Sequence, residues 1–293
     1  MAITLRIGHE HAVKAGVAKA GVAKSGSANS GAAKSGAARG PTESPRQIRA
    51  EAGVRAAAVT WVTSQVGHDI IISCDTVICS DLAQHGFPAG NLHVLQPTAP
   101  DLSSSEVVIA TAGVRSQFGS KLAAVYAPEV IARFGTGANS IDVRVIAPLG
   151  PATFQAALRA DLLARKASGA RLLHNPRVRT SARARAQLAA GRVDHRLLTT
   201  LAFMAHKQPL DILSFGSVAP GASPSVPLRY ADLALKHVAR HLASRAYKRT
   251  LVALARSRAA PHVLLSISKV RVAGGRTVLR IEFAAPSPAG LSS

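Results

Sequence analysis

The stretch DIIISCDTVICSDLAQHGFPAGNLHVL, residues 69–95, decides the fold of the first half of the chain. It begins with an apolar run of strand length at 69–74, continues with a helical pattern that ends at Gly86, and closes with a second apolar run at 91–95. Strands that are apolar throughout are typical of a parallel or mixed sheet whose two faces are both covered by helices. The stretch therefore predicts an α/β unit.

The same alternation continues on both sides of this stretch. Its pattern predicts one helix over residues 52–66 and another over 113–127. It also predicts two further strands, EVVIAT (106–111) and IDVRVI (141–146), and the turn TGANS leads into the second of these strands. We predict a small Rossmann-like three-layer domain over 52–148. No G-x-G-x-x-G follows the first strand, so we predict neither a nucleotide site nor any other cofactor.

The second half predicts an α+β domain over 151–285. A long amphipathic helix over 152–173 is expected to end near Gly169, and two more helices follow within 175–207, with Ser181 as N-cap and Gly191 as helix stop. PLDILSFG (209–216) predicts a strand and 230–258 a basic helix. Residues 262–283 predict a β-hairpin that turns at Gly274 and Gly275.

Residues 1–51 predict a disordered basic arm, and residues 286–293 a tail. Glycine recurs every five residues from Gly16 to Gly36, a period that matches neither helix nor strand. The arm is interpreted as a solubilising tail, with a polyanion-binding arm as the alternative. The opening residues lack the apolar stretch of a secretory signal, which leaves open a cytoplasmic location and a truncated gene product.

The formal net charge of +21 is unevenly distributed along the chain. Residues 1–55 carry +6, residues 56–150 carry −3 and residues 151–293 carry +18. A positive field of this kind favours anionic partners such as wall polymers, lipid headgroups or nucleic acid. Aromatic residues for base stacking make up only 4% of the chain, which disfavours specific nucleic-acid binding.

The two cysteines, Cys74 and Cys79, have a spacing that fits neither a thioredoxin-like C-x-x-C motif nor a complete zinc site. In an exported protein they could form a small disulfide loop where a strand turns into a helix. The alternative is a pair of small buried side chains.

The first half resembles the extracytoplasmic α/β domain of actinobacterial membrane glycosyltransferase-like proteins. The resemblance rests on WVTSQVGHDIIISCD (61–75), VVIATAGVRSQFG (107–119) and RFGTGANSIDVRVI (133–146), and covers roughly residues 55–147. It implies a location at the cell envelope, outside the membrane. It implies no catalytic residue, because the chemistry of those proteins belongs to their membrane part.

The second half resembles an actinobacterial branch of the zinc D-Ala-D-Ala carboxypeptidase-like fold, on the order of NPRVRTSARARAQLAAGRVDHRLL, DILSFGS and PGASPSVPLRYAD. The resemblance implies a zinc site in which Asp232 matches the family aspartate. Ser225 and Ser217 stand at positions where that family has histidines. A single carboxylate cannot hold a catalytic zinc, which needs three protein ligands. We therefore predict a degenerate peptidase-like domain without catalytic residues.

Three histidines keep a metal site open as an alternative. His237 and His241 are four residues apart and would share one face of a helix, and His262 or Asp232 could add a ligand. The helix lacks the glutamate of an H-E-x-x-H motif, so an exposed histidine pair is the preferred interpretation. Asp232 is expected to cap the helix that follows it.

Basic residues cluster in the second half and are the candidates for polyanion binding: Arg177, Arg179, Arg183, Arg185, Arg245, Lys248 and Arg249. The function that we expect is non-catalytic binding or scaffolding at the cell envelope, with the cleft of the second domain as the expected site. A weakly metal-dependent peptidoglycan-type hydrolase and a polyanion-binding protein are the alternatives. The ligand and the oligomeric state stay open.

Overall fold

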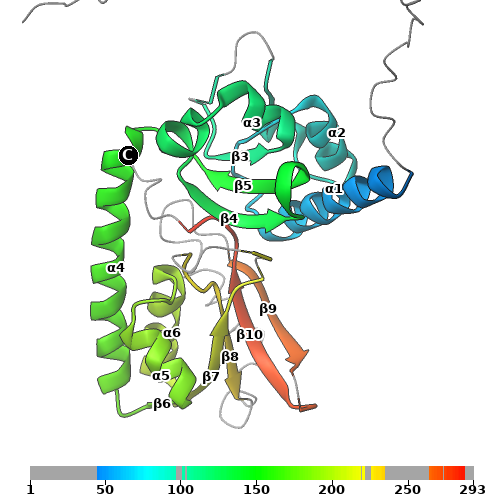
Figure 1. Cartoon of the computed structure of the whole chain (residues 1–293). Coiled ribbons are helices and arrows are strands. Elements are labelled where there is room, and N and C mark those ends of the chain that lie inside the picture. The colour runs from blue at the N-terminus through cyan, green and yellow to red at the C-terminus, as the bar shows by residue number, and fades with distance from the viewer. Residues whose placement is uncertain are drawn as a thin grey trace, which may run out of the picture. The chain divides into compact units, whose positions relative to one another are not determined.

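The computed structural model describes residues 45–96, 101–102, 104–218, 220–221, 226–234, 264–272 and 274–287. In this part of the chain, helices pack on two five-stranded mixed sheets (Figure 1). The prediction of a mixed α/β protein is therefore confirmed at this level.

The first sheet has the strand order β2-β1-β3-β5-β4. Strand β1 lies parallel to β2 and β3, and β5 lies antiparallel to β3 and β4. Its strands are β1 (Ile72–Cys74), β2 (Leu92–Val94), β3 (Val107–Ala110), β4 (Glu129–Phe134) and β5 (Ile141–Val145).

Helices cover both faces of this sheet, as apolar strands require. In β3, Val107 and Ile109 join one core cluster, which includes helix α1 (Pro45–Gln65) and helix α2 (Thr76–Gln84). Val108 and Ala110 join another, with α3 (Ala112–Phe118) and the π-helical turn η2 (Leu122–Tyr126). Two 3-10 turns, η1 (Ala89–Asn91) and η3 (Gly137–Asn139), complete the connections.

The second sheet has the order β6-β7-β8-β10-β9. Strands β6 and β7 are parallel and the other neighbours are antiparallel. The hairpin predicted at Gly274 and Gly275 is confirmed, and both glycines have positive φ, which side chains rarely tolerate. The strands are β6 (Val178–Thr180), β7 (Leu210–Gly216), β8 (Tyr230–Ala234), β9 (Leu264–Arg271) and β10 (Thr277–Phe283).

Three helices pack on this sheet: α4 (Gly150–His174), α5 (Ala182–Ala189) and α6 (His195–Lys207). Ser181 caps α5 by accepting a hydrogen bond from the amide of Ala184, as predicted. Asp194 is the N-cap of α6, and its fully buried carboxylate pairs with Arg196 at 2.8 Å and accepts from the hydroxyl of Ser287 at 2.5 Å. Burial opposes this charge, but the contacts with Arg196 and Ser287 lower the pKa of Asp194 to about 2.

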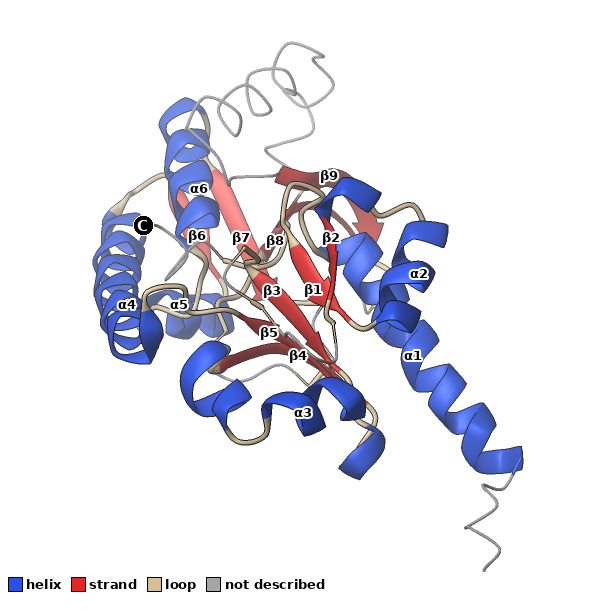
Figure 2. Ribbon diagram, turned by 90° about the horizontal axis from the view of Figure 1, so that it is seen from above, coloured by secondary structure: helices blue, strands red, loops and turns tan. Residues whose placement is uncertain are grey.

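The two sheets are joined by helix α4 and by hydrogen bonds. Phe154 near the start of α4 belongs to the first core, and Leu172 near its end belongs to the second. Figure 2 shows α4 beside α5. Ala285, just after β10, donates its amide to Gln65 at 2.6 Å and accepts from Gly67 at 2.9 Å. These contacts connect the end of α1 to the last described strand.

Four expectations about local structure were wrong. Residues 45–51, expected in the disordered arm, form the first two turns of α1, while the rest of the arm lies outside the described residues. The helix expected over 113–127 is broken at Gly119, where φ is 56°. Helix α4 continues past Gly169, where a Cβ would come within 2.5 Å of the carbonyl oxygen of Leu188. Gly169 is therefore a packing position between α4 and α5.

The fourth error concerns residues 230–234, which were expected to begin a basic helix. They form strand β8, which pairs with β7 on one side and β10 on the other. The remainder of that expected helix lies outside the described residues.

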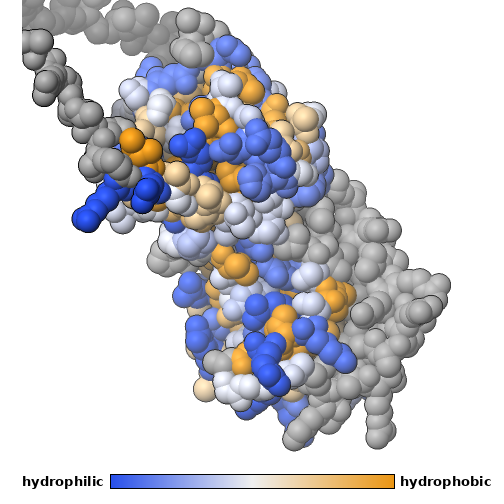
Figure 3. All heavy atoms as spheres, turned by 90° about the vertical axis from the view of Figure 1, so that its right-hand side faces the viewer, coloured by the Kyte–Doolittle hydropathy of each residue, from blue (hydrophilic) through white to orange (hydrophobic). Residues whose placement is uncertain are grey.

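None of the described helices is both long enough and apolar enough to span a bilayer. On the face shown in Figure 3, hydrophobic residues are interspersed among hydrophilic ones over the coloured surface. Two of the large apolar side chains that remain exposed, Val77 and Leu149, lie at the start of helix α2 and just before helix α4.

Candidate functional site

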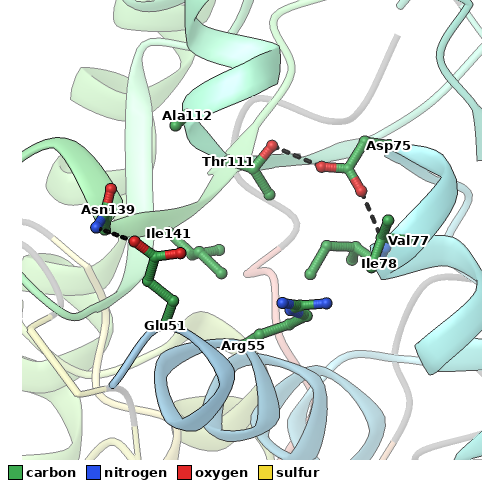
Figure 4. A pocket seen from close by; sticks show the side chains of 9 residues that line it. All are labelled: Glu51, Arg55, Asp75, Val77, Ile78, Thr111, Ala112, Asn139 and Ile141. Atoms are coloured by element: carbon green, nitrogen blue, oxygen red, sulfur yellow. Dashed lines mark hydrogen bonds between the residues drawn. The ribbon is translucent and has the colours of Figure 1, made fainter. Parts of the chain in front are cut away.

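A pocket of about 250 Å³ with both polar and apolar lining lies at the carboxyl ends of the parallel strands β1 and β3 (Figure 4). The chain passes from β1 through α2 to β2 on one side of β1, and later returns to β3 on its other side. This reversal is a topological switch point, the place where open α/β sheets commonly bind ligands. We call this cavity the switch-point pocket.

Two helix caps build the back of the switch-point pocket. Asp75 follows β1 and caps α2 by accepting the amide of Ile78 at 2.9 Å. Thr111 follows β3 and caps α3, and its hydroxyl donates to the second carboxylate oxygen of Asp75 at 2.6 Å. Because both carboxylate oxygens of Asp75 accept hydrogen bonds, this group holds the two strand ends together.

Helix α1 and the loop before β5 form the opposite wall. Asn139 donates to the carboxylate of Glu51 at 2.5 Å. Arg115 fixes the same loop by donating to the carbonyl of Ser140 at 2.6 Å and to that of Ala138 at 2.5 Å. Arg55 extends from α1 into the space between these walls (Figure 4).

The guanidinium of Arg55 is the group in this pocket that the fold does not use. It is half-buried, and within the described chain no hydrogen bond or ion pair reaches it. It can donate to an anionic or hydroxylated ligand, while Ile78 and Ile141 supply apolar surface. Sequence reasoning missed this pocket, because Asp75, Thr111 and Arg55 belong to no spaced motif.

The disulfide considered from the sequence lies beside this pocket. Cys74 ends β1, Cys79 lies in α2, and the structure joins them with Cα atoms 5.5 Å apart. Both side chains are buried. The disulfide joins β1 to α2, and Asp75 lies between its two cysteines in the sequence.

Asp232, the aspartate of the expected metal loop, lies in the middle of β8 and is buried. Arg280 of β10 donates to both of its carboxylate oxygens, at 2.8 and 3.0 Å, and Ser214 of β7 donates at 2.9 Å. The hydrogen bond with Asp232 raises the pKa of Arg280, whose guanidinium also lies 3.8 Å from the ring centre of Tyr230.

The expectation that Asp232 caps a helix was therefore wrong. Its side chain joins three adjacent strands of the second sheet. His237, His241 and His262 lie outside the described residues, as do Arg245, Lys248 and Arg249. In the described ranges, no three His, Cys, Asp or Glu side chains are grouped as metal ligands would be.

The arginines predicted to bind polyanions lie on consecutive elements of the second half. Arg177 precedes β6, Arg179 lies on β6, and Arg183 and Arg185 lie on α5, and all four are exposed. Arg177 donates to the carbonyl of His206 at 2.9 Å.

A separate cavity of about 530 Å³ lies between β4, α4 and the loop after α5. Glu129, at the start of β4, faces it. Burial raises the pKa of Glu129 from 4.5 to about 7, and Arg165 opposes this rise while Asp161 adds to it. We call it the Glu129 cavity.

Comparison with known proteins gives no family assignment: no family model matches the chain, and no curated protein or solved structure is significantly similar to it.

Proposed function

We propose that the chain is a non-catalytic binding or scaffolding protein of an actinobacterial cell envelope. In this proposal the first half is a Rossmann-like domain related to the extracytoplasmic domain of membrane glycosyltransferase-like proteins. The second half is a degenerate zinc D-Ala-D-Ala carboxypeptidase-like domain. The Cys74–Cys79 disulfide supports an exported location, because such bonds persist in oxidising compartments.

One observation carries the non-catalytic part of the proposal: the ion pair between Asp232 and Arg280. A catalytic zinc needs its carboxylate ligand to point an unpaired oxygen at the metal. Both oxygens of Asp232 instead accept hydrogen bonds from a guanidinium, and one also accepts from Ser214. A zinc ion at this carboxylate would have to displace Arg280 and leave its charge unpaired within the sheet.

The switch-point pocket supports the binding part of the proposal. There a carboxylate, an amide and Arg55, which has no partner among the described residues, converge on a cavity at the carboxyl ends of the parallel strands β1 and β3. These groups suit a small polar ligand that contains a hydrogen-bond acceptor for Arg55.

The test is the metal content and the chelator response of protein purified from its native host. The proposal predicts well under one zinc per chain, and a melting temperature that is unchanged by excess chelator. Stoichiometric zinc, together with a lower melting temperature after chelation, would rule out the non-catalytic scaffold in favour of the metal-dependent hydrolase.

The exposed arginines favour a second candidate function, which is polyanion binding by the second half. Since each neutralised phosphate adds to the salt dependence of binding, the interaction with a teichoic acid should weaken steeply with added salt. A variant in which four arginines are changed to Gln should show a weaker salt dependence of teichoic acid binding. The four are Arg177, Arg179, Arg183 and Arg185. The control variant has Arg46 and Arg49 on α1 changed to Gln. Equal salt slopes for the two variants would remove this candidate.

A further inference from the structure

The Glu129 cavity joins groups from three separate parts of the fold. Glu129 comes from β4 at the edge of the first sheet, where its backbone pairs with Val145. Helix α4 contributes one long wall, and the loop after α5 closes the end through Gly191, together with Pro227 of the neighbouring segment before β8. The volume of about 530 Å³ falls within the usual range for small-molecule sites.

The charged lining of the cavity is mostly positive. Arg165 is buried, pairs with Asp161 at 2.5 Å and donates to the carbonyl of Gly191. Arg159 and Arg192 also line the cavity and are exposed toward solvent. Because Asp161 offsets Arg165, the guanidinium of Arg159 is the charge in the described lining that we consider for attracting an anion.

The carboxyl of Glu129 has no hydrogen-bond or ion-pair partner in the part of the chain that the structure describes. On the neighbouring strand β5, Arg144 turns toward the carbonyls of Ala127 and Pro128 and toward Asp142. With burial holding its pKa at about 7, Glu129 is largely protonated in mildly acidic solution and can then donate a hydrogen bond into the cavity.

Apolar side chains complete the chemistry of the lining. Leu158 and Leu162, one helical turn apart on α4, line the cavity on the same side of the helix as Arg159 and Arg165. Pro227 adds further apolar surface to the lining. A ligand that fits this lining carries a negative head and a short aliphatic body.

We propose that the Glu129 cavity binds a small aliphatic carboxylate. The carboxylate accepts a hydrogen bond from the protonated carboxyl of Glu129 and is attracted by the guanidinium of Arg159, while its chain contacts Leu158 and Leu162. This site is distinct from the switch-point pocket and from Asp232, so it stands or fails independently of the proposed function.

Hexanoate is the probe, and hexylamine is the comparison, since it has the same chain with the opposite charge. Binding is followed on the full chain by the NMR shifts of the backbone amides of Glu129 and Gly191. For so small a ligand we expect a Kd of about 1 mM at pH 6. If hexanoate binds only when Glu129 is protonated, a pKa of about 7 makes the affinity about 30-fold weaker at pH 8.5 than at pH 6.

Three variants separate the site from general surface attraction. Glu129→Gln keeps the size and donates at every pH, so its affinity should differ less than about threefold between pH 6 and pH 8.5. Arg159→Gln should weaken binding at pH 6 by about fivefold or more. Arg171→Gln, on the exposed C-terminal part of α4 outside the cavity, is the matched control and should change affinity less than about twofold.

Several results would overturn the proposal. The first is the absence of saturable hexanoate binding up to about 20 mM at pH 6. The second is binding of hexylamine as tight as that of hexanoate. The third is an equal loss of hexanoate affinity in Arg159→Gln and Arg171→Gln. A pH dependence that persists unchanged in Glu129→Gln would also overturn it, because the titrating group would then lie elsewhere. Circular dichroism of each variant establishes that it is folded before its affinity is compared.

Discussion

The ion pair between Asp232 and Arg280 can be tested by a double-mutant cycle in which Asp232→Asn and Arg280→Met are made singly and together. The side chain of Asp232 is 4% exposed and that of Arg280 is 22% exposed. Breaking a fully buried pair costs roughly 3–5 kcal/mol, because the remaining charge loses its partner without gaining water.

The expected costs of the two single changes differ because the two partners differ in exposure. After Asp232→Asn, the partly exposed Arg280 keeps some solvent and its contact with Tyr230, so we expect a loss of about 2–3 kcal/mol in the free energy of unfolding. After Arg280→Met, the nearly inaccessible Asp232 loses its ion-pair partner and, among the described residues, keeps the hydrogen bond from Ser214, so we expect a loss of about 3–5 kcal/mol in the free energy of unfolding. The coupling energy of the cycle should be about 2 kcal/mol.

Urea denaturation, followed by circular dichroism, measures all four proteins. Arg271→Met, at the exposed end of β9, is the control and should change stability by less than about 0.5 kcal/mol. A coupling energy below about 0.5 kcal/mol would refute the reasoning, since Asp232 and Arg280 would then not stabilise the fold as a pair.

Three further predictions concern other contacts. Asp194→Asn should lower the free energy of unfolding by about 3–5 kcal/mol at pH 7. The difference in urea stability between the unchanged protein and this variant should decrease as the pH falls from 3.8 toward 2, because the lowered pKa of Asp194 stabilises the fold fully above that range and no longer below it. A difference that does not change with pH would contradict this. Reducing the Cys74–Cys79 bond should lower stability by about 2 kcal/mol through the entropy of its short loop, whereas an unchanged urea midpoint after complete reduction would show that the bond does not stabilise the protein. Arg55→Gln should change stability by less than about 0.5 kcal/mol while Arg115→Gln loses about 2 kcal/mol, and a comparable loss for both would mean that Arg55 serves the fold.

Local signals in the sequence were enough to predict much of the fold. The apolar strands β1 and β3, the cap at Ser181 and the paired glycines of the last hairpin each depend on neighbours within a few residues. Such features are encoded by side-chain periodicity and backbone conformation, and both can be inferred without knowing the tertiary contacts.

The errors came where distant segments decide the local structure. Residues 230–234 continue into a pattern with helical periodicity, yet they form a strand because β10, more than 40 residues later, pairs with them. Strand β6 was not predicted, because its three residues are too few to show an alternation of apolar and polar side chains. Gly169 was interpreted as a helix end because the close approach of Leu188 cannot be seen from the sequence.

The candidate sites were harder to predict than the fold. Nothing local marks Glu129, because its raised pKa arises from burial beneath an element that starts some 20 residues later. The partner of Asp232 comes from a strand 48 residues away, so a match to a metal-ligand position could not be told from a structural ion pair. Both assignments depend on tertiary packing.

The most direct test of the non-catalytic account is the anomalous diffraction of crystals soaked in zinc, measured at the zinc absorption edge. The account predicts no anomalous peak near Asp232 and a guanidinium of Arg280 that still donates to both carboxylate oxygens. A zinc ion bound by Asp232 together with imidazole ligands, with Arg280 displaced, would contradict it.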